Sequence, residues 1–94
     1  MHTHKKISPE FIITYDISDN KKRRSLYNLL SGYGIALQKS VFLCPLHSIQ
    51  QKEIKSALNA IDLDFQEAIH CFQVNESTSL PSPSIISRLN WIIE

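Results

Sequence analysis

The sequence predicts an α+β fold in which two helices cover one face of an antiparallel sheet. Three observations predict it. Short runs of β-branched and aromatic residues alternate with two segments that have helical hydrophobic spacing. The hydrophobic content of 43% with 20% charged residues is typical of a globular chain. A length of 94 residues suits a single small domain.

The first predicted strand covers residues 11–17, whose sequence FIITYDI is rich in β-branched and aromatic side chains. Turn and helix-capping residues follow it at Ser18, Asp19 and Asn20. A helix is expected over residues 21–31, because apolar side chains recur there at helical spacing (Leu26, Leu29, Leu30 and Tyr33). Gly32 or Gly34 would end this helix.

The second half of the predicted domain repeats the alternation of strand and helix. Residues 35–44 (IALQKSVFLC) form either one bent strand or two strands with a kink near Gln38 and Lys39. Ser48 and Gln51 have the spacing of a capping box, which predicts a second helix over residues 49–61. Residues 68–74 (AIHCFQV) are expected to form another strand.

The ends of the chain differ in composition from the segment between them. Residues 1–9 are expected to form a flexible tail, and residues 10–75 the folded domain. Residues 76–94 comprise a Ser/Pro-rich connector and a terminal element, for which helical spacing favours a short helix over the alternative of a strand. The order of elements is therefore that of a ferredoxin-like β-α-β-β-α-β sandwich with a short C-terminal helix or strand.

Several classes of function are excluded by the sequence. No apolar run approaches the about 20 residues needed to span a bilayer, and the N-terminus lacks an apolar signal segment, so a cytoplasmic protein with no membrane association is expected. Cys44 and Cys71 are expected to be buried reduced thiols. With only Gly32 and Gly34, the chain has neither a Walker loop nor a dinucleotide-binding motif.

The basic residues concentrate in the N-terminal half. Residues 1–39 carry a net charge of +4 and the remainder −3. The run Lys21-Lys22-Arg23-Arg24 occupies the first turn of the predicted helix, where the macrodipole disfavours cations unless phosphates face them. A solvated charge run explains these residues equally well. No aromatic residue is interleaved with them, which favours contact with a nucleic-acid backbone over stacking on bases.

Asp16 stands at the end of the first strand, directly before the turn residues. A carboxylate there is suited to Mg²⁺, which prefers oxygen ligands. One carboxylate is a poor site, but a two-fold axis beside this strand end would let the Asp16 residues of two copies share a metal ion. The spacing alone favours an ordinary turn aspartate. Because both faces of the predicted sheet carry apolar residues, a second copy is expected to cover the face without helices.

Motifs at residues 11–46 resemble the CRISPR-associated Cas-two (Cas2) family, the smaller of the two near-universal CRISPR adaptation proteins. They are Tyr15-Asp16-Ile17, Arg23-Arg24, Tyr33-Gly34, Gln38 and Ser40-Val41-Phe42, in that order. The resemblance implies a ferredoxin-like homodimer that bridges two dimers of the CRISPR integrase subunit and holds the duplex DNA of a new spacer (the prespacer). Members of this family commonly end in a strand that adds to the partner's sheet, whereas the tail of this chain has helical spacing.

The resemblance also implies residue roles. Asp16 would be the catalytic residue and the ligand of a shared Mg²⁺ in the family members described as metal-dependent endonucleases. Arg23 and Arg24 would face phosphates. With the other basic residues of the N-terminal half, the cations expected to bind nucleic acid are Lys21, Lys22, Arg23, Arg24 and Lys39. Tyr15, Gln38, Ser40 and Phe42 would shape the second hairpin and the contact with the partner.

Three functions follow as expectations. The first is a non-catalytic homodimeric adaptor that positions duplex DNA for the integrase in spacer acquisition, a step of antiviral defence. The second is a Mg²⁺-dependent endonuclease, acting on RNA or DNA, that uses paired Asp16 residues. The third is a toxin-type ribonuclease of similar fold.

Overall fold

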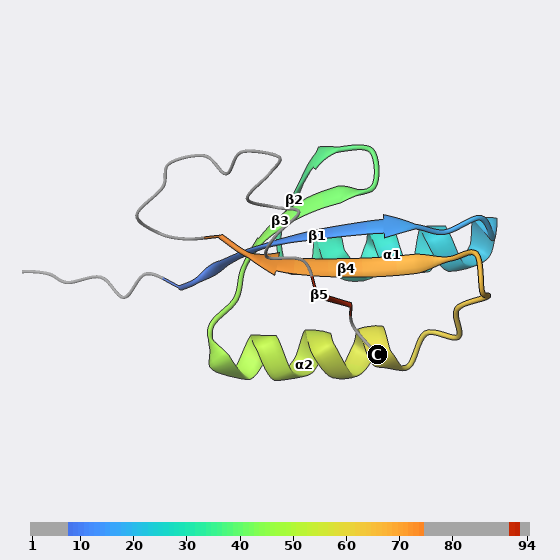
Figure 1. The fold of residues 1–94 in the computed structure, drawn as a ribbon. Helices are drawn as coiled ribbons and strands as arrows, with labels where there is room; N and C mark the ends of the chain where they lie inside the picture. Colours follow the sequence, from blue (N-terminus) through green and yellow to red (C-terminus); the bar gives the residue numbers. More distant parts are fainter. Residues whose placement is uncertain (1–7, 75–90, 93–94) are drawn as a thin grey trace, which may run out of the picture.

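The structure, a computed structural model, describes residues 8–74 and 91–92. Its elements are β1 (Glu10–Asp16), α1 (Asn20–Ser31), β2 (Ile35–Gln38), β3 (Val41–Pro45), α2 (Ser48–Asn59), β4 (Ala68–Gln73) and β5 (Trp91–Ile92). The strands form one antiparallel sheet in the order β2-β3-β1-β4-β5. The α+β class and the β-α-β-β-α-β order predicted from the sequence are confirmed (Figure 1).

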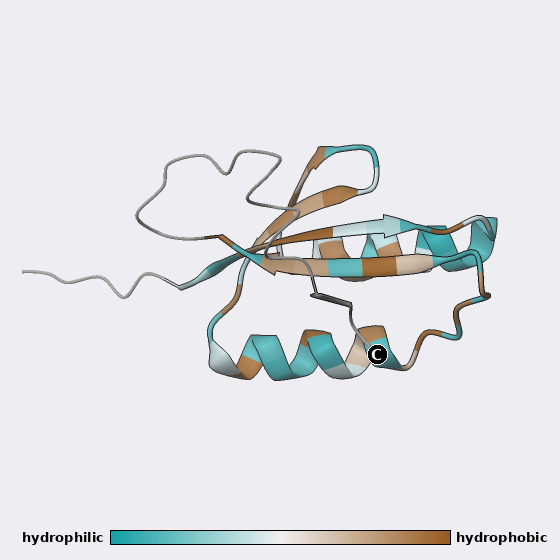
Figure 2. Cartoon of the chain, in the orientation of Figure 1, coloured by the Kyte–Doolittle hydropathy of each residue, from teal (hydrophilic) through white to brown (hydrophobic). Residues whose placement is uncertain are grey.

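Both helices cover the same face of the sheet, as predicted. Alternate residues of β1, β3 and β4 point to this face and meet Leu26 and Leu30 of α1 and Ile54 and Leu58 of α2 in one buried core. Apolar residues run through the central strands, while much of each helix is hydrophilic (Figure 2). This is the pattern of helices that bury one side and expose the other.

The two helices begin with different caps. The Asp19 carboxylate caps α1 by accepting the Lys22 N–H at 2.9 Å, as an N-cap aspartate does. For α2 the predicted capping box was wrong by one residue: His47, not Ser48, is the N-cap. Its Nδ1 accepts the Gln50 N–H at 3.3 Å, and the Gln50 side chain accepts the His47 N–H at 3.1 Å.

Residues 35–45 form two strands rather than one bent strand. Lys39 and Ser40 make the turn between β2 and β3, and Ser40 adopts a positive φ of 64°. The Tyr15 N–H donates to the Ser40 carbonyl at 3.1 Å, so the turn is tied to the end of β1. This bond places the β2–β3 hairpin beside the start of α1.

The terminal helix expected within residues 76–94 is wrong at Trp91–Ile92, where the structure has strand β5 paired antiparallel with β4. Pairing satisfies backbone groups that the edge of β4 would otherwise leave open. The other residues of this segment lie outside the described residues, as do residues 1–7 of the predicted tail.

The face of the sheet without helices carries an apolar row. Ile35, Leu43, Ile12 and Phe72 lie opposite one another across β2, β3, β1 and β4. Ile12 and Phe72 are buried, Leu43 is half-buried and Ile35 is 63% exposed. The expectation that apolar residues occupy this second face is confirmed.

Two further expectations concern the thiols and the membrane. Cys44 and Cys71 are free and buried, as predicted, and burial raises their pKa values to about 11 and about 12. Both thiols therefore stay protonated and unreactive near neutral pH. In the part of the chain that the structure describes, neither helix has the length and apolar character needed to cross a bilayer.

Candidate nucleic-acid interface

An open cavity of about 630 Å³ lies between the start of α1 and the β2–β3 hairpin, and we call it the α1–hairpin cavity. It is lined by Tyr15, Asn20, Arg23, Arg24, Tyr27, Ala36, Gln38, Lys39 and Ser40. Six of these residues were singled out from the sequence, three as cations and three as structural residues. The fold thus brings together residues that the sequence spreads over 26 positions, from Tyr15 to Ser40.

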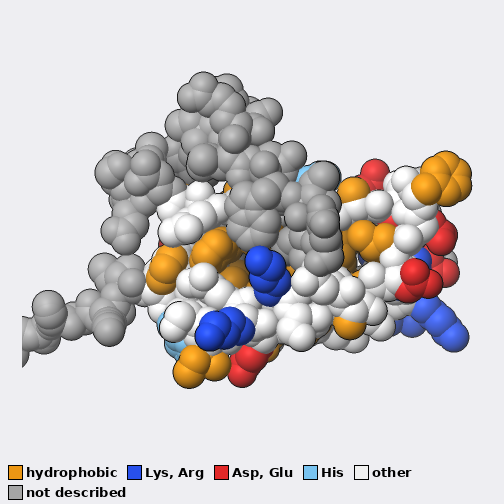
Figure 3. Space-filling view, turned by 60° about the horizontal axis from the view of Figure 1, so that its bottom comes forward, with side chains coloured by type: hydrophobic (Ala, Val, Ile, Leu, Met, Phe, Trp, Pro, Cys, Tyr) orange, Lys and Arg blue, Asp and Glu red, His pale blue; other side chains and the backbone are white. Residues whose placement is uncertain are grey.

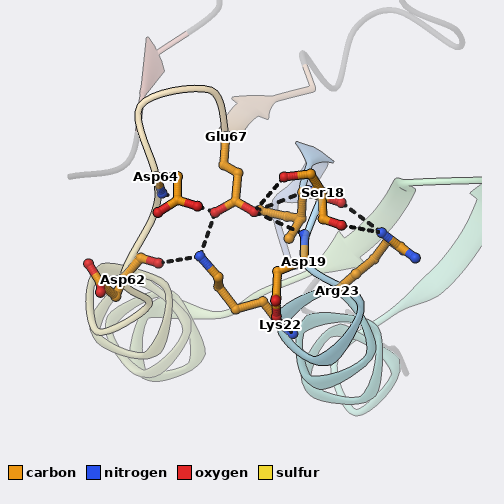
Figure 4. A network of polar contacts seen from close by, with 8 residues as sticks. Ser18, Asp19, Lys22, Arg23, Asp62, Asp64 and Glu67 are labelled. Carbon is orange, nitrogen blue, oxygen red and sulfur yellow. Dashed lines mark hydrogen bonds and ion pairs between the residues drawn. The ribbon is translucent and has the colours of Figure 1, made fainter.

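Arg23 is held in the cavity wall by neutral groups. Its guanidinium donates to the carbonyl of Ser18 at 3.4 Å (Figure 4), to the carbonyl of Ile17 at 2.9 Å and to the side chain of Asn20. These acceptors fix the orientation of the guanidinium but do not cancel its charge. In residues 8–74 and 91–92, no carboxylate lies within ion-pairing distance of Arg23, Arg24 or Lys39. Three positive charges around one opening attract an anion.

Lys22 differs from its neighbours because its charge is compensated inside the chain. Its ammonium lies 2.5 Å from the Glu67 carboxylate and donates to the Asp62 carbonyl at 2.7 Å. Lys21 and Lys22 line a separate cavity of about 280 Å³ on another side of α1. Successive helical residues point in directions about 100° apart, so the four-cation run divides between two surfaces. The structure therefore sets Lys21 and Lys22 apart from the α1–hairpin cavity.

Glu67, which the sequence analysis did not single out, anchors the loop between β1 and α1. Its side chain is fully buried and accepts five hydrogen bonds (Figure 4). The donors are Ser18 N (3.1 Å), Ser18 Oγ (3.1 Å), Asp19 N (3.1 Å), Asp64 N (3.0 Å) and Lys22 Nζ (2.5 Å). The Asp64 amide, then Lys22, holds the pKa of Glu67 down to about 2. In the sequence, the only sign of this role is that Glu67 is an acidic residue directly before a predicted strand.

Tyr27 is the second residue that sequence analysis missed. It follows Arg23 by four positions and Arg24 by three, which places the three side chains on one side of α1. Tyr27 is 49% exposed, and its ring packs against the ring of Phe42 with the centroids 5.3 Å apart and the planes at 72°. Tyr15 lies in the same cavity, and burial raises the pKa of its hydroxyl. The run Lys21–Arg24 itself contains no aromatic residue, but the fold places two tyrosines beside two of its cations.

Asp16 lies apart from the cavity. It is the last residue of β1 and is exposed, and alternation along the strand places it on the face opposite Tyr15. Among the described residues no group of three or more His, Cys, Asp or Glu side chains could hold a metal ion. One chain thus offers a single carboxylate at this position, which by itself does not fit the requirements of Mg²⁺.

The residues expected to shape the hairpin and the partner contact occupy different environments. Gln38 is exposed and lines the α1–hairpin cavity, and Ser40 lies in the turn between β2 and β3. Phe42 is 1% exposed and belongs to the core of its own chain, where it also lies 6.5 Å from the Tyr15 ring. Its place in the structure is thus inside the chain rather than at a surface open to a partner.

Comparisons with known proteins agree with this fold. Residues 10–79 match the family model described as "CRISPR associated protein Cas2". The chain is 31% identical over 68 residues to a CRISPR-associated endoribonuclease Cas2 of Synechocystis, covering 72% of this chain and 74% of the relative. It is 32% identical over 65 residues to a protein of the same description from Chloroflexus aurantiacus, covering 69% and 70%.

A solved structure is also similar. A hypothetical protein from Thermus thermophilus superposes with a TM-score of 0.66 at 28% identity, covering 79% of this chain and 90% of the other. The family model spans most of the chain and includes the strand that ends in Asp16, the cations of α1 and the β2–β3 hairpin. On these grounds the chain belongs to the Cas2 family of CRISPR-associated proteins.

Proposed function

We propose that this chain is the small adaptor subunit of a CRISPR adaptation complex, which works as a homodimer, binds the backbone of prespacer duplex DNA and bridges integrase subunits. The observation that supports it best is the set of three cations around the α1–hairpin cavity, Arg23, Arg24 and Lys39. Their charges have no carboxylate partner in the described part of the chain. The proposal places the protein in the cytoplasm, the compartment that holds the CRISPR array.

Binding through these cations would be independent of sequence. Phosphates are the sequence-independent feature of a duplex, and cations that contact them release condensed counterions. Arg23 is half-buried with a fixed guanidinium, whereas Arg24 and Lys39 are exposed. A pre-positioned guanidinium loses less freedom on binding than a mobile side chain, so Arg23 would set the register of the backbone.

The homodimer would form through the face of the sheet without helices. The apolar row on this face continues outward to Ile35, which is 63% exposed and would be covered by a second copy. A two-fold axis through this face would display the cations of two copies on one assembly. The duplex would then contact twice the number of positive charges that one chain offers.

The proposal is tested by measuring duplex DNA binding by fluorescence anisotropy at several salt concentrations. Removing one cation that contacts phosphate should weaken binding to all sequences alike and lower the magnitude of the salt slope by about 1. We expect this for Arg24→Ala and for Lys39→Ala, whereas Lys52→Ala, an exposed lysine on α2, serves as the charge-matched control. Equal losses for all three variants, or no binding by the unmodified chain at low salt, would rule the proposal out.

A Mg²⁺-dependent endonuclease is the second candidate. It is favoured by the exposed carboxylate of Asp16 at a strand end, and by the name endoribonuclease that the relatives from Synechocystis and Chloroflexus aurantiacus carry. Because one chain offers a single carboxylate, the metal ion would need Asp16 from two copies. Cleavage should then disappear in Asp16→Asn and in EDTA; cleavage that survives both would exclude this candidate.

A further inference from the structure

We propose that the α1–hairpin cavity binds one unpaired nucleotide, with its base against Tyr27 and its phosphate at Arg23 and Arg24. The inference rests on the proposed function, because it assumes that nucleic acid is the partner. It adds a site for an unpaired residue to the sequence-independent contact with the duplex. Such a residue occurs at the end of a strand or where a nucleotide leaves the stack.

The first support is the combination of charge and an aromatic ring in one cavity. Exposed cations alone suit a paired backbone, but a base can stack only where a ring is accessible. Tyr27, a residue that is 49% exposed, offers its ring beside Arg23 and Arg24, whose charges have no carboxylate partner in the described part of the chain. A base inside a duplex is already stacked on both sides, and the outermost base of a blunt end is still held by its pair, so an unpaired base is the one best able to enter the cavity and stack on this ring.

The second support is that the ring is held in place before any ligand arrives. Tyr27 packs against Phe42, which is 1% exposed and fixed in the core. Arg23 is fixed by the carbonyls of Ile17 and Ser18. A site whose side chains are already ordered loses little conformational entropy on binding.

The third support is the polar lining. Gln38 and Ser40 extend from the hairpin side of the cavity, opposite the arginines of α1. An amide offers both donors and acceptors, and a hydroxyl can act as either, so the pair can meet the edge of any base. The phenol of Tyr15, like any tyrosine, is protonated at neutral pH and adds a donor at the same cavity.

The cavity is separate from the position expected to bind metal. Tyr15 points to the face of the sheet that the helices cover, and Asp16 points to the opposite face. A nucleotide in the cavity would therefore be held away from Asp16. The inferred role is recognition of an unpaired residue, not its cleavage.

The test compares two duplexes of one sequence, a blunt duplex and a duplex with one unpaired 2-aminopurine nucleotide at a 5′ end. Stacking of one base on an aromatic side chain corresponds to about 5- to 150-fold in affinity. We expect the unpaired nucleotide to increase affinity within that range. The fluorescence of 2-aminopurine should fall on binding, because stacking quenches it.

Three variants assign the effect to Tyr27. Tyr27→Leu keeps apolar cover over Phe42 but has no ring, so the advantage of the unpaired nucleotide and the quenching should both be lost. Tyr27→Phe should keep both. Phe65→Leu removes an aromatic residue that is 96% exposed and does not line the cavity, and should also keep both. Thermal unfolding of each variant verifies that it is folded.

The outcomes separate this inference from the proposed function. If the blunt duplex binds and the unpaired nucleotide adds nothing, the inference is overturned and the adaptor proposal stands. If Tyr27→Leu keeps the advantage, the base does not stack on Tyr27 and the inference is overturned as well. If neither duplex binds, both proposals fall.

Discussion

Near the start of α1, the partner of each charged side chain determines whether its charge is compensated inside the chain. Lys22 and Arg23 are adjacent in sequence, yet Lys22 is paired with a buried carboxylate and Arg23 with neutral carbonyls. The Lys22 ammonium contributes to folding, while the charge of Arg23 has no carboxylate partner among the described residues. Glu67 pairs with Lys22 but not with Arg23. It also accepts the backbone N–H groups of Ser18 and Asp19, which fixes the loop before α1.

The buried carboxylate of Glu67 makes stability depend on pH. Its pKa falls from an ordinary 4.5 to about 2 on folding, so its contribution is complete above pH 4.5 and is lost as the pH falls towards 2. Glu67→Gln removes the charge, so the variant should unfold at lower urea concentration than the parent at pH 7. The difference in unfolding midpoint between Glu67→Gln and the parent should narrow at pH 3.

Urea unfolding at pH 7, 5 and 3 measures the effect, with Glu10→Gln, at an exposed position on β1, as the control. A gap of constant size at the three pH values would show that the Glu67 charge is not the cause. If Glu67→Gln were as stable as the parent at pH 7, the hydrogen bonds and the ion pair described for Glu67 would be contradicted.

Among the helices and strands, α1 and β2 are joined by a connection whose Gly34 lies against the backbone of β3. A Cβ atom on Gly34 would lie 2.1 Å from the Leu43 carbonyl oxygen and 2.7 Å from the Cα of Cys44. Both are backbone atoms of β3, so no side chain can move aside. Gly32, the C-cap of α1, is different: its nearest neighbour would be the Leu29 carbonyl oxygen at 3.4 Å.

Gly34→Ala should therefore shift β2 or β3 and destabilise the protein by about 1–3 kcal/mol, the usual cost of overpacking. Gly32→Ala is the matched control, because its φ of −79° suits alanine and the change should be neutral or slightly stabilising. Thermal or urea unfolding of the pair gives both values. Equal stability of the two variants would contradict the close packing of Gly34 against β3.

Local patterns predicted most of these elements, and the exceptions depend on distant residues. Strands β1 and β4 and both helices follow from alternation and helical spacing to within two residues. The α2 cap was misplaced because histidine is not among the common N-cap residues. The terminal segment was misassigned at Trp91–Ile92 because a short apolar run is ambiguous and the edge of β4 decides it.

Local patterns likewise identify some residues of the candidate site, while others depend on contacts between distant residues. Arg23, Arg24 and Lys39 were identified from the sequence, and the fold gathers them around one cavity. The contact between Lys22 and Glu67 joins residues 45 positions apart, so no local pattern reveals it. Tyr27 could have been predicted from the sequence, because helical spacing places it on the side of α1 that carries Arg23 and Arg24.

For the chain as a unit, charge is distributed unevenly. The cavity cations lie between α1 and the hairpin, while Asp62 and Asp64 belong to the loop after α2. Figure 3 shows acidic side chains gathered at one end of the molecule, beside a protruding hydrophobic one. The loop that carries Asp62 lies beside the start of α1, where its carbonyl accepts from Lys22, so an elongated anion such as a duplex would approach from the side of α1 that faces the hairpin.

If the chain is an adaptor, spacer acquisition requires the positive charge around the α1–hairpin cavity but does not require the Asp16 carboxylate. The most direct measurement is spacer acquisition in cells that carry the integrase and a CRISPR array, with the chain replaced by variants. Arg23→Ala/Arg24→Ala should abolish acquisition or reduce it severely, whereas Asp16→Asn should acquire spacers at the parental rate. Acquisition that survives loss of both arginines but fails in Asp16→Asn would contradict the account.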